Sequence, residues 1–138
     1  MPIVNRVADL HDEITAWRHD LHAHPELLYD VHRTAASVAD KLKSFGCDEV
    51  VTGIGRTGVV GVIHGRKGAS AKAIGLRADM DALPIAEANL FAHRSHHQGK
   101  MHACGHDGHT TMLLGAARYL AETRNLAVSA VVIFQPAE

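Results

Sequence analysis

The stretch HTTMLLGAARYLAETRNLAVSAVVIF (109–134) decides the fold, because its periodicity changes from helical to strand-like. Residues 109–123 repeat small and aliphatic side chains at helical spacing, which predicts a helix. Residues 128–134 form a continuous apolar run, as expected for a buried strand. An earlier strand is predicted at AIGLR (73–77). Because a helix precedes the apolar run, we expect the two strands to be parallel, with a right-handed crossover.

The rest of the chain predicts two helices followed by short strands. Apolar residues at spacings of three and four predict a first helix over residues 7–22. A second stripe, residues 35–45, has Thr34 as a possible N-terminal cap. Strands are predicted at 50–52 and 58–64, and GRKGAS (65–70) predicts a hairpin turn. The order predicts an α/β fold with a mixed sheet flanked by helices, in which residues 128–134 present a free edge.

Composition excludes several classes of protein. The chain has 138 residues and a formal net charge of −1, so it lacks the basic patch of a nucleic-acid-binding protein. Its longest apolar run is about half a membrane span, so no membrane partner is expected. Two cysteines cannot form a disulfide framework, and the N-terminus lacks the apolar block of a signal peptide. We therefore expect one cytoplasmic domain.

Polar segments gather at one predicted edge of the sheet. RADMDALP (77–84) and QPAE (135–138) follow the two parallel strands, and GKMHACGHDGHT (99–110) lies between them in the sequence. In open α/β sheets, ligands bind outside the carboxyl ends of parallel strands. We therefore expect the chemistry of this protein at that edge.

The 12 histidines are the unusual feature of the composition, and their positions distinguish surface residues from metal ligands. In extended backbone Cys104 and His106 lie on the same side, so both could reach one ion, and a thiolate with an imidazole suits zinc. His102 and His109 are further potential ligands, and Asp107 is a possible cap of the following helix. His19 and His22, on the polar flank of the first helix, are expected at the surface. His24 is expected to close a turn, and residues 93, 96 and 97 to lie in a solvated loop.

The acidic residues leave two interpretations open. Asp81 could cap a turn before Pro84, or one of Asp79 and Asp81 could orient a ligand or hold a metal. Glu138 could activate a metal-bound water as a general base, or be an ordinary charged residue.

The segments DLHAHPEL (20–27), GLRADMDALPI (75–85), GKMHACGHDGHT (99–110) and VVIFQPAE (131–138) resemble the metal-dependent amidohydrolases. This family includes hippurate hydrolase, N-acyl-amino-acid amidohydrolases and indole-acetyl-amino-acid hydrolases, and it is related to zinc carboxypeptidases and aminoacylases. The resemblance implies a two-metal catalytic domain like that of aminopeptidases and carboxypeptidases. It implies two divalent ions, such as Zn, Mn, Co or Ni.

The same resemblance assigns roles residue by residue. Cys104 resembles the bridging metal ligand, His106 a ligand of one metal, and Glu138 the general base. Supporting or outer positions fall to five further residues: Asp79, Asp81, His102, Asp107 and His109. The implied substrates are N-acyl amino acids of the hippurate (N-benzoylglycine) type, and the implied assembly is a homo-oligomer. Residues 1–138 resemble the N-terminal part of the catalytic domain, without its lid or dimerisation domain, so we expect the chain alone to be inactive.

Three other functions are compatible with the sequence. Within the enzymes, these are a metallo-carboxypeptidase or a deacylase of N-acyl biosynthetic intermediates. In a different class, a non-catalytic, histidine-rich metal-binding module would explain the histidine content, with weak sites at residues 93, 96 and 97.

Overall fold

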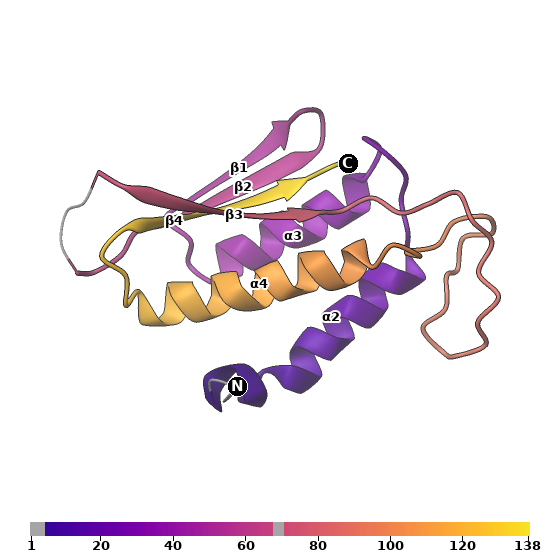
Figure 1. Cartoon of the computed structure of the whole chain (residues 1–138), viewed down its shortest axis with the longest axis horizontal. Helices are drawn as coiled ribbons and strands as arrows, with labels where there is room; N and C mark the ends of the chain where they lie inside the picture. The colour runs from indigo at the N-terminus through magenta and orange to yellow at the C-terminus, as the bar shows by residue number, and fades with distance from the viewer. Residues whose placement is uncertain (1–4, 68–70) are drawn as a thin grey trace.

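The computed structural model describes residues 5–67 and 71–138. It contains one four-stranded sheet with helices packed against one of its faces (Figure 1). The elements in chain order are α1 (Asn5–Asp9), α2 (His11–Ala23), α3 (His32–Ser44), β1 (Glu49–Ile54), β2 (Gly58–Ile63), β3 (Ala73–Asp79), α4 (His106–Thr123) and β4 (Ser129–Gln135). The long connection between β3 and α4 extends beyond one end of the sheet (Figure 1). None of the helices in the two described ranges is long and apolar enough to cross a membrane.

The strand order is β1-β2-β4-β3, and the sheet is mixed. β2 pairs antiparallel with both β1 and β4, whereas β3 pairs parallel with β4. The predicted α/β class and the parallel pairing of the two strands around the crossover helix are therefore confirmed. The parallel register sets Asp79 opposite Gln135. The polar residues that follow β3 and β4 consequently leave the sheet side by side.

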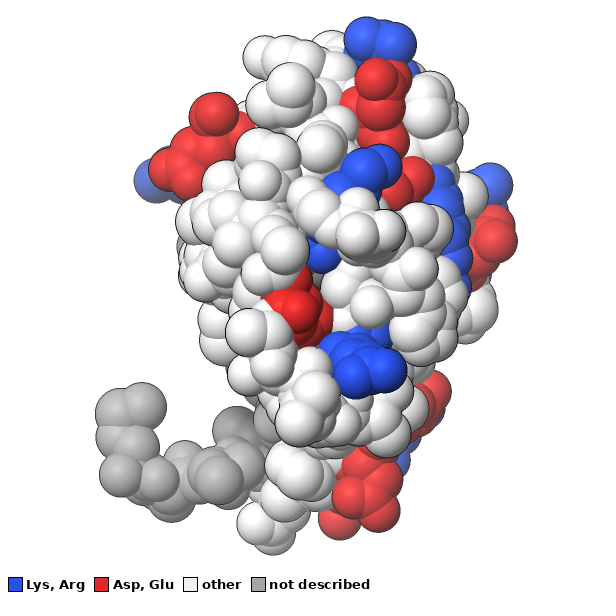
Figure 2. Space-filling model, turned by 90° about the vertical axis from the view of Figure 1, so that its right-hand side faces the viewer, with Lys and Arg blue, Asp and Glu red and all other residues white. Residues whose placement is uncertain are grey.

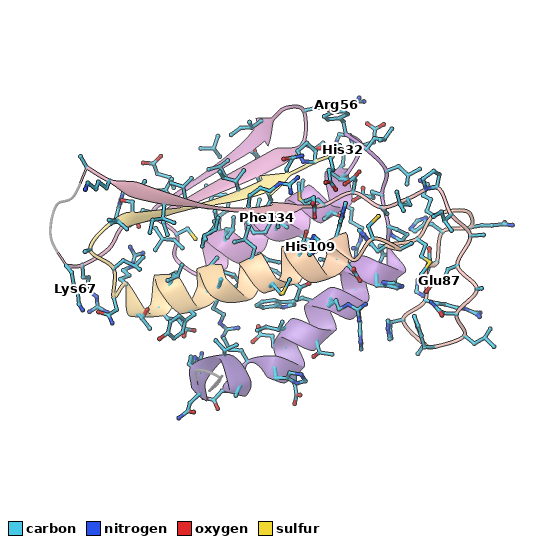
Figure 3. All side chains as sticks on the ribbon, in the orientation of Figure 1. His32, Arg56, Lys67, Glu87, His109 and Phe134 are labelled. Carbon is cyan, nitrogen blue, oxygen red and sulfur yellow. The ribbon has the colours of Figure 1, made fainter. Side chains whose placement is uncertain are left out.

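The core lies between the sheet and the helices α3 and α4. Phe134 and Val132 of β4 are fully buried, as are Leu42 of α3 and Leu114 of α4. Figure 3 shows Phe134 in the space between the sheet and the helices. Ile133, which points to the opposite face, is 37% exposed. β4 is therefore a core strand, as predicted, but in the described chain α3 and α4 cover only one of its faces.

Two predictions about strand neighbours are wrong. β2 and β3 are not paired, as the predicted hairpin requires, because β4 lies between them. Residues 68–70 of the predicted turn lie outside the described residues. For the same reason β4 is an interior strand, and the edges of the sheet are β1 and β3. The connection through α4 brings β4 beside β3, and the other side of β4 pairs with β2.

The helices differ from the sequence predictions in two respects: whether the first predicted helix is continuous and what caps α3. The predicted helix 7–22 is divided into α1 and α2 around Leu10. Thr34 lies inside α3 and does not cap it. Instead, the carboxylate of Glu26 accepts hydrogen bonds from the backbone N–H groups of Arg33 and Thr34. These are first-turn donors that have no partner within the helix, so a residue of the preceding loop performs the capping role.

Candidate metal centre

Three elements bring polar side chains together at the carboxyl end of the parallel strand pair. β3 ends in Asp79 and is followed by Asp81; α4 begins with His106 and carries His109 in its first turn; Glu138 follows β4. Figure 3 shows His109 on the first turn of α4, directly below the sheet. The structure therefore brings together five of the residues that the sequence singled out. Figure 2 views this end of the molecule, where acidic and basic side chains are scattered and neither sign forms a continuous patch.

His106 is held in one orientation by Asp81. Its Nδ1 lies 2.9 Å from the backbone oxygen of Asp81 and 3.1 Å from its Oδ1. Both atoms are acceptors, so Nδ1 carries the proton and donates. In the neutral ring, Nε2 then has a free lone pair. Fixing the ring and its tautomer in this way is what the outer partner of a metal-bound histidine does.

The lone pair of His106 Nε2 points between two carboxylates. The distance from Nε2 to Glu138 Oε2 is 3.4 Å, and that to Asp79 Oδ2 is 3.7 Å. Both exceed the usual length of an N–H···O hydrogen bond. One imidazole nitrogen facing two carboxylates, at more than hydrogen-bond distance, is a donor set that fits a divalent cation.

Asp79 joins the two histidines of α4. His109 Nδ1 donates to Asp79 Oδ1 at 2.8 Å. Burial alone would raise the pKa of Asp79, but the hydrogen bond from His109 and the interaction with His106 outweigh it, so the pKa falls below its usual value. Asp79, His106 and His109 offer ligand atoms that all lie within 4.8 Å of one another. In the described part of the chain, this is the group with the geometry of a metal site.

Cys104 lies beside this group but not within it. Its side chain is exposed, and it lines a cavity of about 400 Å³ together with His106 and Glu138. The backbone between Cys104 and His106 is not extended as the sequence analysis assumed. Gly105 adopts a left-handed conformation (φ +87°) and precedes the first residue of α4. The ligand roles of Cys104 and His106 and the base role of Glu138 stay predictions.

Asp107 faces away from the candidate centre, into a buried ion network that the sequence analysis missed. Asp107 has no capping hydrogen bond to α4; its Oδ2 lies 2.8 Å from His22 Nδ1 and 3.2 Å from Arg18 Nε. His22 Nε2 lies 3.0 Å from Glu87 Oε1. Each ring nitrogen of His22 therefore faces a carboxylate oxygen. Together these four side chains tie α2 and the long loop to the first turn of α4.

Glu87, which Figure 3 shows in the long loop, accepts several hydrogen bonds in this network. Burial by itself would raise the pKa of Glu87, but hydrogen bonds from the Ser95 N–H, Asn89 and His22 lower the pKa to about 2. His102 lies next to the network, with its ring centroid 6.4 Å from that of His22. Burial lowers the pKa of His102 to about 4, so its ring is neutral at neutral pH.

The prediction of a surface position for His22 is wrong: its exposed fraction is 3%. The long loop packs over the last turn of α2, and a helix periodicity carries no information about such a loop. His24 closes a turn as predicted, because its Nδ1 donates to the backbone oxygen of Asp20 at 2.8 Å. His19 is half-buried because its ring stacks on that of His93 at 3.7 Å.

Comparisons with known proteins relate the chain to metal-dependent hydrolases. The model of Peptidase family M20/M25/M40 matches residues 75–138, which include all five residues of the candidate centre. The chain is 51% identical, over its full length, to a hippurate hydrolase from Campylobacter jejuni, of which it covers 35%. It is 44% identical over 119 residues, 86% of this chain, to an N-acyl-L-amino acid amidohydrolase from Geobacillus stearothermophilus, of which it covers 31%.

A solved structure agrees with these sequence matches. A dinuclear metal-binding peptidase of the M20 family from Bacillus subtilis superposes with a TM-score of 0.88 at 38% identity, over 95% of this chain and 36% of that one. Residues 75–138 of the chain thus match the M20 peptidase family, and a solved structure of that family shares the fold. The chain spans about a third of the length of the curated relatives that it matches.

Proposed function

We propose that this chain is the N-terminal part of the catalytic domain of an M20 amidohydrolase, whose full-length form hydrolyses the amide bond of N-acyl amino acids. Hippurate-type substrates are the proposed subclass, supported by the 51% identity to a hippurate hydrolase. The single observation that carries the proposal is His106, whose Nε2 faces two carboxylates while Asp81 holds the other side of the ring. We place the full-length enzyme in the cytoplasm, as a homo-oligomer.

The proposed centre holds two divalent ions, of which zinc, manganese, cobalt and nickel are the candidates. His106 and Cys104 are the proposed ligands from this chain, and Asp79 and His109 support them. Bound ions of this kind polarise an amide carbonyl and lower the pKa of water to about 7. In the proposed reaction, a residue of the chain itself accepts and donates the proton.

Glu138 is the proposed general base and acid. Its carboxylate is exposed and lies 3.4 Å from His106 Nε2, so it can reach a water molecule at the centre. As the water oxygen bonds to the carbonyl carbon, Glu138 accepts the proton that the water loses. When the carbon–nitrogen bond breaks, Glu138 returns that proton to the departing amine. The products are a carboxylic acid and an amino acid.

A histidine-rich metal-binding module is the less favoured function. It would place metal at residues 93, 96 and 97. Among the described residues, only Asp79, His106 and His109 form a group with metal-site spacing. His93 instead stacks between His19 and Phe91. The histidines of the loop therefore contribute to packing, and the group at the strand ends favours an enzyme.

Replacing the proposed base tests this function. In the full-length enzyme, Glu138→Gln should keep the bound metal but lower kcat for benzoylglycine by about 10²–10⁴-fold, because the water loses its proton acceptor. Glu49→Gln, at the start of β1, is the matched control and should keep wild-type kcat. A Glu138→Gln enzyme with kcat within a few-fold of wild type would show that another group is the base.

A further inference from the structure

An apolar cavity of about 400 Å³ opens directly beside the candidate metal centre. One wall carries Cys104, His106 and Glu138. The opposite walls are aliphatic and come from two separate segments, residues 27–28 and 82–84. Cavities of this size, with apolar walls and a few polar groups, typically bind small molecules.

The two apolar walls are fixed to each other by the backbone. Leu27 pairs with Ala82 in a parallel bridge, and the N–H of Ala82 donates to the backbone oxygen of Glu26 at 2.8 Å. Leu83 in turn pairs with Met101, three residues before Cys104. The cavity is therefore built on the same backbone framework as the candidate ligands.

Leu28 occupies a conformation that a leucine rarely adopts. It follows the first residue of a tight turn, in which the Asp30 N–H donates to the Leu27 oxygen, and its φ is +52°. Glycine and asparagine favour this position because other side chains crowd the backbone there. The Leu28 side chain gains little from packing within the chain, since it is 63% exposed. A large apolar side chain held in this conformation at the rim of a cavity indicates a role in that cavity.

The apolar walls of the cavity favour one half of an N-acyl amino acid. Residues 27–28 and 82–84 supply five aliphatic lining residues, and no lysine or arginine is among the residues described as lining the cavity. A neighbouring cavity, which Glu138 also lines, is lined by Arg77. The amino-acid half of the substrate carries a carboxylate, for which the first cavity offers no lysine or arginine partner. The acyl half is uncharged and can pack against the aliphatic walls.

We propose that the cavity binds the acyl group of the substrate and that Leu28 determines which acyl groups are preferred. The proposal rests on the proposed amidohydrolase function and adds the subsite for one half of the substrate. An aromatic or branched acyl group would contact Leu28 and the aliphatic wall at residues 83–84. An acetyl group, which ends in a single methyl, would make fewer of these contacts.

The test compares kcat/KM of the full-length enzyme for N-benzoylglycine and N-acetylglycine. Leu28→Ala should lower the benzoyl-to-acetyl ratio about tenfold, mainly through KM for the benzoyl substrate, because several apolar contacts are lost. Leu28→Gly should lower the ratio at least as much without lowering the melting temperature, since glycine suits the turn. Leu90→Ala removes another exposed leucine, 86% exposed and outside the cavity, and should leave the ratio unchanged.

The outcomes separate the two proposals. A wild-type enzyme that hydrolyses neither substrate overturns the proposed function and, with it, the acyl subsite. A wild-type enzyme that is active, combined with Leu28 variants whose ratio is unchanged or higher, overturns the acyl subsite alone. A ratio that falls in both Leu28 variants and not in Leu90→Ala supports it.

Discussion

The two nitrogens of His106 have separate tasks, and this division gives the candidate centre its chemistry. Nδ1 is occupied by the backbone and side chain of Asp81, so the ring cannot turn or change tautomer. Nε2 is directed at the space between Asp79 and Glu138. The basicity of Nε2, and with it the affinity for a cation, depends on the negative charge behind Nδ1.

Asp81→Asn tests the effect of that negative charge, because it keeps the size of the side chain and removes the charge. In the full-length enzyme we expect a loss of metal affinity of about 10–100-fold, measured by competition with a chelator, because outer partners of metal-bound histidines have effects of this size. Asp12→Asn, on the exposed side of α2, should leave the affinity unchanged. Equal affinities in Asp81→Asn and wild type would remove Asp81 from the centre.

At the residue scale, the sequence predicted where the candidate centre lies but not which of its side chains contact each other. Asp79, Asp81, His106 and Glu138 were expected at one edge of the sheet because topology alone places them there. Which carboxylate holds which histidine depends on how the first turn of α4 is rotated, and the left-handed Gly105 sets that rotation. The burial of His22 was missed because it arises from a distant loop.

The connection from α4 to β4 is anchored on the end of β2. The N–H of Lys67 donates to the Leu126 oxygen at 3.0 Å, and the N–H of Arg66 to the Arg124 oxygen at 2.9 Å. A Cβ on Gly65 would lie 2.2 Å from the Leu126 oxygen. A glycine at position 65 is therefore needed for β2 and the crossover to approach each other this closely.

Gly65→Ala should destabilise the fold by about 1–3 kcal/mol, because the backbone must move to relieve the contact. Thermal unfolding of the full-length enzyme measures the effect. Gly75→Ala is the matched control in β3, where a new Cβ would meet only Ile133 Cδ1 at 3.7 Å. It should change stability by no more than about 1 kcal/mol. If both variants unfold at the wild-type temperature, the close approach at Gly65 does not constrain the fold.

Element types were predictable from periodicity, and the parallel strand pair was predictable because a helix connects the two strands. The neighbours of β4 were not. A continuous apolar run shows neither which strands pair with β4 nor whether one of its faces is exposed. β2, which pairs with β4, comes from an earlier part of the chain. Capping of α3 by Glu26 could not be predicted from the sequence either, since the capping residue lies in the preceding loop.

At the scale of the whole molecule, the chain supplies only part of the proposed centre. Closed zinc sites use four ligands, so two ions require more than Cys104 and His106 provide. The curated relatives are about three times as long as this chain, which leaves room for the remaining ligands outside residues 1–138. We therefore expect the isolated chain to bind metal more weakly than the full-length enzyme and to be inactive.

Metal content per chain tests the central claim most directly. After dialysis, elemental analysis should give two divalent ions per chain for the full-length enzyme and for a His97→Ala control. It should give one or none for His106→Ala and for Cys104→Ala, because each removes a ligand of the centre. Two tightly held ions in both ligand variants would contradict the placement of a dinuclear centre at these residues.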